Sequence, residues 1–184
     1  MTKVLYGQEH LASFDTTRAV QLRLLDGPLD LAWKHSSMTS DFIAEMIALR
    51  FRPSKRRYNQ VRHDISYLTN ELIENAIKFR ASGEIAIEAV AEGDNFKMRV
   101  SNFVDRETAI KFQQLLSNIT QGDPSDLLIQ QIEASAATIG SGSGLGLLTL
   151  MSDYQADLAW LFEEDSPRNR AKLETYAAMP ISPS

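Results

Sequence analysis

Two short segments, far apart in the chain, place the strongest constraints on how it can fold. Asn70–Phe79 reads NELIENAIKF, and Gly140–Leu148 reads GSGSGLGLL. Residues three and four positions apart share one face of a helix, so Glu71, Asn75 and Lys78 of the first segment fall along one stripe. The second segment is a glycine-rich loop that runs into a helix. Read together, the two segments predict the two halves of one ligand pocket.

The stripe of the first segment combines three kinds of chemistry. The amide oxygen of Asn75 is a neutral, hard ligand that suits Mg²⁺. The carboxylate of Glu71, one turn earlier, can orient and deprotonate a water or hydroxyl nucleophile. The ammonium group of Lys78, one turn later, can hold a phosphate as a point charge. The alternative reading is an amphipathic helix whose polar edge carries these three residues for solubility alone.

The glycine-rich segment has the composition of an anion-binding loop. Gly142, Gly144 and Gly146 allow the backbone to approach a ligand closely, and a helix N-terminus presents free N–H groups to anions. Ser141 and Ser143 add hydroxyl donors. The spacing is not that of a P-loop, because no Gly-Lys-Ser/Thr follows. It is not the dinucleotide-binding fingerprint either, because a helix rather than a strand is expected before the loop. The alternative is a flexible linker that closes a helix.

Composition excludes several classes of site. The chain of 184 residues is 43% hydrophobic, which suffices for a core, and its formal net charge of -5 does not favour a large nucleic-acid footprint. It has no cysteine, which excludes disulfides, thiolate zinc sites and cysteine nucleophiles. His10, His35 and His63 lack metal-ligand spacing. With no signal-peptide pattern and no apolar run of membrane length, we expect a cytoplasmic protein without a membrane partner.

Hydrophobic periodicity predicts the order of the elements. The expected helices are about 40–50, Tyr58–Arg80, Glu107–Ser117, Asp126–Ile139 and the segment from the glycine loop to Tyr154. The expected strands are Gln21–Leu25, Leu29–Lys34, Glu84–Ala91, Phe96–Val104, Ala156–Phe162 and Leu173–Met179. Residues 1–18 are polar, and we expect part of this segment to be loose. This order predicts a single α+β domain over 1–184, a two-layer sandwich of one mixed or antiparallel sheet with helices on one face. Its core would span about 36–179, preceded by a strand hairpin at about 20–35.

Taken together, the two motifs resemble those of the Bergerat-fold ATPases, the superfamily of gyrase, the heat-shock chaperone ATPase, histidine kinases and mismatch-repair ATPases. NELIENAIKF is similar to the N-box of that family, and GSGSGLGLL is similar to its second glycine box. The resemblance runs from about Ser36 to Met179, and it implies the Bergerat ATP-binding fold with ATP and Mg²⁺ as cofactors.

The resemblance also implies roles for individual residues. Asn75 matches the magnesium-binding asparagine, Glu71 matches the general base, and Lys78 matches a basic position near the phosphates. Gly142, Gly144 and Gly146 match the lid loop around the triphosphate, and Ser141 and Ser143 lie in the same loop.

The adenine-binding box of the family is altered in this chain. The family carries an Asp-x-Gly box after the central hairpin, and its aspartate accepts a hydrogen bond from the adenine amino group. Here the place is taken by VSNFVD at Val100–Asp105, and Asn102 is the candidate replacement because an amide oxygen is still an acceptor. The glycine of that box and the late Gly-Thr pair of the family are absent.

Among the members of the superfamily, the chain is similar to the stand-alone serine/threonine kinases of bacterial partner-switching systems, which include anti-sigma-factor kinases. This resemblance implies that a small antagonist protein is phosphorylated, and stand-alone members of this group often form homodimers. The altered adenine box leaves a second hypothesis open, a degenerate domain that sequesters a regulatory protein without catalysis. A third hypothesis uses the basic residues between Arg50 and Arg62 to dock an anionic surface or nucleic acid, and the net charge argues against it.

Overall fold

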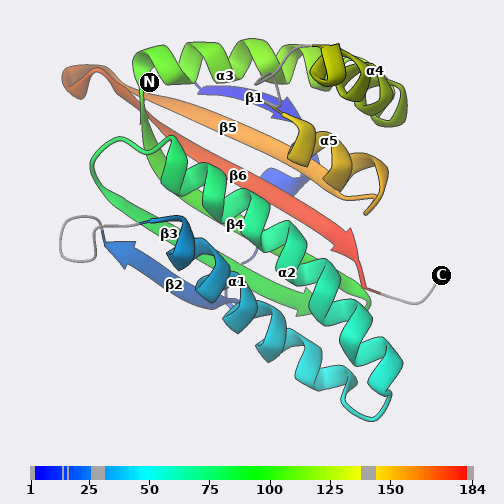
Figure 1. Ribbon diagram of the computed structural model, residues 1–184. Helices are drawn as coiled ribbons and strands as arrows, with labels where there is room; N and C mark the ends of the chain where they lie inside the picture. The colour runs from blue at the N-terminus through cyan, green and yellow to red at the C-terminus, as the bar shows by residue number, and fades with distance from the viewer. Residues whose placement is uncertain (1–2, 14, 16, 26–31, 138–143, 182–184) are drawn as a thin grey trace.

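The computed structural model describes residues 3–13, 15, 17–25, 32–137 and 144–181. This part of the chain forms one sheet with the α-helices against one of its faces (Figure 1). The strands are β1 (Lys3–Gly7), β2 (Val20–Leu25), β3 (Glu84–Glu92), β4 (Asn95–Asp105), β5 (Asp157–Asp165) and β6 (Arg170–Pro180). The α-helices are α1 (Trp33–Ala48), α2 (Lys55–Lys78), α3 (Arg106–Ile119), α4 (Pro124–Ala137) and α5 (Leu145–Ser152). Short 3-10 helices cover η1 (Glu9–Ser13), η2 (Leu49–Phe51) and η3 (Ser166–Arg168).

The six strands are arranged in the order β1-β5-β6-β4-β3-β2. Every neighbouring pair is antiparallel, so the sheet is antiparallel rather than mixed. The two central strands, β4 and β6, pair along their whole length, from Asn95 opposite Pro180 to Asp105 opposite Arg170. The expected α+β two-layer sandwich with helices on one face is therefore confirmed.

The core lies between the sheet and the helices because one face of each strand is apolar. Along β4 the buried and partly buried positions alternate, as the period of two requires. Its buried side chains include Phe96, Met98 and Val100, and they join the apolar face of α2, including Leu68 and Ile73, in one hydrophobic cluster. This packing fixes α2 across the middle of the sheet, where it carries the NELIENAIKF segment (Figure 1).

Most of the expected elements are observed with shifts of a few residues at their ends. The helices at 58–80, 107–117 and 126–139 correspond to α2, α3 and α4, and the helix after the glycine loop is α5, which ends at Ser152 rather than Tyr154. The paired strands at 84–104 and at 156–179 correspond to β3–β4 and β5–β6. The end of the expected fourth helix, residues 138–139, lies outside the described residues.

The sequence analysis predicted no strand within residues 1–18, and the structure has one there. Lys3–Gly7 forms the edge strand β1, which pairs with β5 from Lys3 opposite Glu163 to Gly7 opposite Ala159. Leu11 of η1 then packs against Ala159 and Tyr176. This pairing partner lies far along the sequence, so no local pattern reports it.

The strand expected at Leu29–Lys34 was wrong, and so was the hairpin at 20–35, although its first strand, Gln21–Leu25, corresponds to β2. Residues 29–31 and the turn at 26–28 lie outside the described residues, but α1 already begins at Trp33. The polar stretch that was expected to precede this helix is part of it, because its serine hydroxyls form hydrogen bonds within the protein. Ser40 Oγ donates to the Ser36 carbonyl at 2.7 Å, and Ser36 Oγ donates to Asn70 Oδ1 of α2 at 3.1 Å.

No helix in the described part of the chain combines the length and the apolarity needed to cross a membrane.

Candidate functional site

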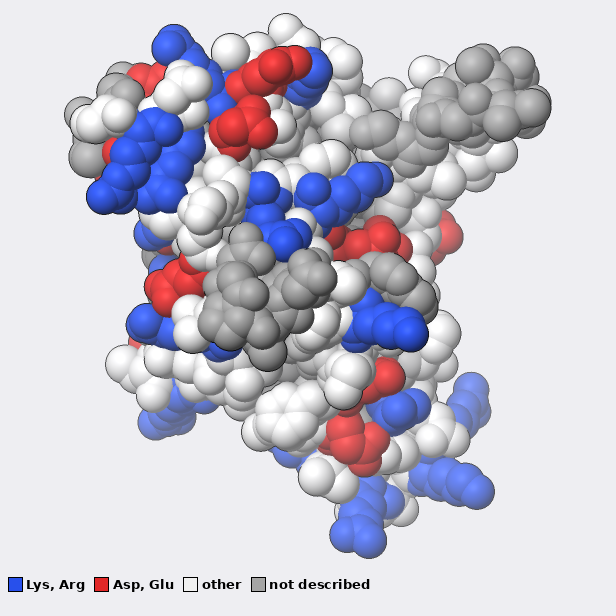
Figure 2. Space-filling model, turned by 60° about the vertical axis from the view of Figure 1, so that its left-hand side comes forward, with Lys and Arg blue, Asp and Glu red and all other residues white. Residues whose placement is uncertain are grey.

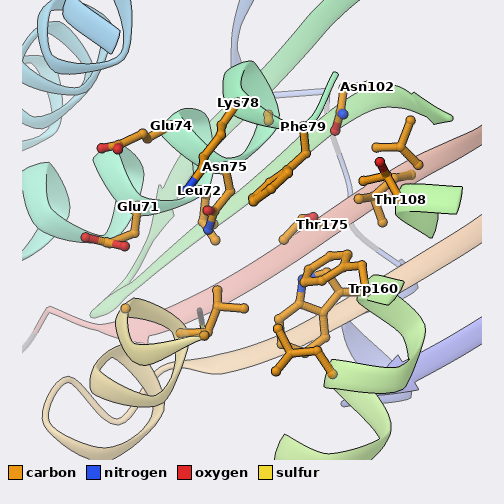
Figure 3. A pocket seen from close by; sticks show the side chains of 18 of the residues that line it. Glu71, Leu72, Glu74, Asn75, Lys78, Phe79, Asn102, Thr108, Trp160 and Thr175 are labelled. Atoms are coloured by element: carbon orange, nitrogen blue, oxygen red, sulfur yellow. The ribbon is translucent and has the colours of Figure 1, made fainter. Parts of the chain in front are cut away.

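A cavity of about 570 Å³ opens between α2, α3 and α5, with the sheet as its floor (Figure 3). Helix α2 contributes Glu71, Glu74, Asn75 and Lys78 to its lining, and Phe79 follows directly after the helix. Helix α3 forms a second wall, β4, β5 and β6 form the floor, and Gly144 and Gly146 border the cavity at the start of α5. The volume lies within the range of about 300–1,000 Å³ that is typical of small-molecule sites.

The two sequence motifs meet at this cavity, at the contact between Gly146 and Glu71. An ideal Cβ atom added to Gly146 would lie 2.0 Å from Glu71 Oε2 and 2.8 Å from Glu71 Cδ. Only a residue without a side chain can therefore occupy this position while the carboxylate stays in place. The glycine spacing, which could have belonged to a linker, here brings the backbone of α5 against the expected general base.

Gly144 gives the chain its entry into α5. It is the N-cap residue of the helix with φ +89°, in the left-handed region that favours glycine. A Cβ atom here would lie 3.3 Å from the Leu115 side chain of α3. Gly144 and Gly146 therefore line the cavity as expected, whereas Ser141, Gly142 and Ser143 lie outside the described residues.

The Glu71 carboxyl is partly buried at the edge of the cavity, and no described residue donates a hydrogen bond to it. Burial raises the pKa of Glu71 above its ordinary value, and the negative charge of Glu74 adds to the shift. A carboxylate with a raised pKa and a free lone pair is suited to accept a proton.

A pair of stacked tyrosines holds α2 against the end of α5. The rings of Tyr67 and Tyr154 are parallel within 9°, and their centroids are 4.8 Å apart. Burial and the charge of Glu71 raise the pKa of Tyr67 at this contact. This contact fixes the helix that carries Glu71 relative to the helix that follows the glycine loop.

Asn75 and Lys78 point into the same cavity from α2 (Figure 3). Neither forms a hydrogen bond or ion pair with another described side chain, and the Lys78 ammonium lies 5.1 Å from the centroid of the Phe79 ring. Since no described residue occupies these two polar groups, both are available to a ligand.

Asn102 lies at the other end of the cavity, within strand β4. Its side chain is 4% exposed, and Nδ2 donates to the Phe103 carbonyl at 3.3 Å. This bond orients the amide so that Oδ1 is left as an acceptor, and no described residue donates to it. The position is a strand rather than the loop that a glycine-containing box would form.

Thr175 of β6 is a polar floor residue that the sequence analysis did not single out. It is 8% exposed and lines the cavity with Asn102. A signal for it existed, because it is the polar member among the inward-facing positions 171, 173, 175, 177 and 179 of its strand. Trp160 of β5 and Phe112 of α3 complete the apolar part of the lining, and their places follow from tertiary packing alone.

Asp105, at the end of the altered adenine box, caps α3. It accepts hydrogen bonds from the Thr108 backbone N–H and from Thr108 Oγ1, both at 2.8 Å. These bonds lower the pKa of Asp105, because they favour its charged form. Asp105 therefore holds the N-terminus of α3 in place and is not available to bind a nucleobase.

We expect Asp105→Ala to lower the free energy of unfolding by about 1 kcal/mol in urea denaturation at pH 7, the usual contribution of such a cap. Since the pKa is lowered in the folded state, this contribution is present above the ordinary aspartate pKa and is lost as the pH falls through the folded value. Ser54→Ala is the control, because Ser54 caps α2 through a longer 3.4 Å bond to the Arg57 N–H. A free energy of unfolding for Asp105→Ala equal to that of the wild type would contradict the assignment.

The basic residues between Arg50 and Arg62 are in part used within the chain. Arg50 donates to the Ala91 carbonyl at 2.6 Å. Arg57 pairs with Asp94, and Arg62 pairs with Glu45, each at 2.9 Å. On the face shown in Figure 2, the described basic and acidic side chains are interspersed.

Comparisons with known proteins identify a protein that shares the fold, but they do not show the chemistry of the site. No protein-family model matches the chain, and no curated protein sequence matches it. Among solved structures, a chain of the SiaB–SiaC complex from Pseudomonas aeruginosa superposes with a TM-score of 0.58. The alignment covers 88% of this chain and 91% of that chain at 15% sequence identity. At this identity the likeness shows a shared fold.

Proposed function

We propose that this protein binds ATP·Mg as a member of the Bergerat-fold superfamily, and that it is a serine/threonine protein kinase of a bacterial partner-switching system. Its substrate would be a hydroxyl group of a small regulatory protein. The observation that carries the proposal is the contact of Gly146 with Glu71 at the edge of a cavity that also holds Asn75 and Lys78. Two motifs that could each be interpreted without a ligand thus line one cavity whose volume suits a small molecule.

In the proposed reaction, Glu71 orients the hydroxyl of the partner and accepts its proton. The hydroxyl oxygen forms a bond to the γ-phosphorus, the bond from that phosphorus to the β–γ bridging oxygen breaks, and ADP leaves. The raised pKa of Glu71 increases its basicity. Lys78 and the backbone N–H groups at the start of α5 would stabilise the phosphate charge.

The residues of the cavity fit a magnesium ion that is bound together with the nucleotide. The Asn75 amide oxygen is a suitable ligand, and no group of three acidic, histidine or cysteine side chains in the described residues could hold a metal alone. Mg²⁺ usually takes one or two protein ligands and completes its shell with phosphate oxygens and water. When bound, it would neutralise charge on the β- and γ-phosphates.

The proposed partner is a small regulatory protein. The structure that shares the fold is that of a complex between two proteins, SiaB and SiaC, which supports a protein partner for this chain. A homodimer belongs to the same proposal, as in the stand-alone kinases that the sequence resembles.

A second candidate function is a regulatory domain that sequesters its partner without phosphorylating it. The altered base end of the cavity favours it, since Asn102 is uncharged, is 4% exposed and lies in a strand without the glycine that would open space for a base. A neutral acceptor forms a weaker hydrogen bond than a carboxylate does.

Thermal unfolding with added nucleotide separates the two candidates. ATP·Mg at 100 times Kd should stabilise the folded state by about 2.7 kcal/mol, which corresponds to a rise of about 5–10 °C in Tm for a chain of this size. GTP·Mg is the matched control, because the free Asn102 Oδ1 can accept from the amino group of adenine but not from the carbonyl of guanine. No shift with millimolar ATP·Mg would favour the non-catalytic candidate.

A further inference from the structure

Lys111 is a charged residue of the cavity that neither sequence motif supplies. The other charged side chains that line it, Glu71, Glu74 and Lys78, all come from α2. Among the described residues, Lys111 is thus the charged group on the opposite wall, α3. A residue in this place faces whatever ligand lies between the two helices.

The neighbours of Lys111 on α3 pack within the protein, whereas the Lys111 side chain is exposed. Phe112 packs edge to face against Trp160, with ring centroids 6.3 Å apart, and Asp105 holds Thr108. Lys111 instead pairs with Glu107 at 2.6 Å on the helix surface, where the two side chains are 71% and 78% exposed. Exposed pairs of this kind contribute little to stability, so the ammonium group can leave Glu107 at small cost. Because Glu107 raises the pKa of Lys111, the group stays protonated.

The charge of the cavity supports a second phosphate-binding cation. Its four charged lining side chains are two carboxylates and two ammonium groups, which sum to zero. ATP·Mg brings a net charge of about -2. Lys78 alone would leave part of that charge facing Glu71 and Glu74, and Lys111 can offset it from the other wall.

We propose that Lys111 binds the phosphate chain of the nucleotide from α3, opposite Lys78, and that it exchanges Glu107 for phosphate when the nucleotide enters. This inference rests on the proposed function, and it adds to it a binding residue from a helix outside both motifs. Glu107 then acts as a competitor that holds the ammonium group in the absence of ligand.

The test compares binding of ATP·Mg and of adenosine to the wild type and to Lys111→Gln by isothermal titration calorimetry. Lys97→Gln is the matched control, because Lys97 also forms a surface pair, with Glu92 at 2.9 Å, but lies on β4 and does not line the cavity. Lys111→Gln should weaken ATP·Mg binding about tenfold, as expected for one charge-assisted contact, and should leave adenosine binding unchanged. Glu107→Gln should strengthen ATP·Mg binding about twofold, because it removes the competitor.

Two results would overturn the inference and leave the proposed function standing: wild-type ATP·Mg affinity in Lys111→Gln, or an equal loss of ATP·Mg and adenosine affinity. The first shows no contact, and the second shows a contact to the nucleoside rather than to the phosphates. A wild-type protein that binds neither ligand would overturn the proposed function, and this inference with it.

Discussion

Gly146→Ala should strongly reduce phosphoryl transfer to the partner while the protein stays folded. The added methyl group would lie 2.0 Å from Glu71 Oε2, so the carboxylate must leave its place. A carboxylate is the far end of a flexible side chain, and alanine is a better helix former than glycine. We therefore expect a change in the free energy of unfolding of at most about 1 kcal/mol. Transfer should fall about 100-fold or more, the effect of losing a positioned general base.

The measurement is phosphate transfer from labelled ATP to the partner, alongside urea denaturation. Gly122→Ala is a matched control, since its Cβ atom would also meet a side chain, that of Leu127 at 3.1 Å, but away from the cavity. In a Glu71→Ala background, Gly146→Ala should have little further effect on transfer, because both act on the same group. Wild-type transfer by Gly146→Ala would remove the contact from the mechanism.

The sequence predicted well the elements whose pairing partners are near in sequence, and those whose hydrophobic pattern repeats over many residues. Helix α2 repeats its apolar positions over many turns, and β3 and β4 alternate on either side of the two-residue turn formed by Gly93 and Asp94. In these segments local propensity and tertiary packing require the same hydrophobic pattern, so the local sequence is sufficient to predict the element.

The elements that the sequence missed depend on contacts between distant residues. Strand β1 is short and partly exposed, and its partner β5 lies at the other end of the chain. The start of α1 carries Ser36 and Ser40, which read as a polar loop until Asn70 and the helix backbone accept their hydrogen bonds. Polar residues with distant partners cannot be told from exposed ones by pattern alone.

The residues of the candidate site also fall into those that a local sequence pattern reveals and those that only the packing reveals. The residues of the two motifs were found because their spacing places them on one helix stripe or in one loop. Thr175 could have been found as a polar residue at an apolar position of its strand. Lys111 could not, because a Glu-Lys pair four residues apart on an exposed helix face is common, and only the packing of α3 against the sheet brings it to the cavity.

Replacing Glu71 by glutamine should affect catalysis and stability in opposite directions. Glutamine cannot accept the proton of the hydroxyl, so phosphate transfer should fall by about 100-fold or more. ATP·Mg should still stabilise the protein, because Asn75 and Lys78 remain. A loss of nucleotide binding equal to the loss of transfer would show that Glu71 supports the ligand rather than the reaction.

The stability of this variant should depend on pH in a defined sense. The folded-state pKa of Glu71 is raised by burial and by Glu74, so the ionised carboxylate destabilises the folded protein. This cost is fully present above the raised pKa and disappears as the pH falls through that value towards the ordinary one. Glu71→Gln should therefore melt above the wild type at pH 8, because it removes the cost of burying the ionised carboxylate. At pH 4 the two should melt together.

Glu74→Gln tests whether the electrostatic part of this account is correct. Burial, the larger cause of the raised Glu71 pKa, remains in this variant, but the added effect of the neighbouring charge is removed. The acid limb of the rate profile for transfer should therefore move to lower pH while transfer itself persists. A structural effect on α2 would instead lower the rate at every pH without moving the limb. An acid limb at the same pH in Glu74→Gln and the wild type would mean that the titrating group is not Glu71, and a second carboxylate would then have to be sought as the base.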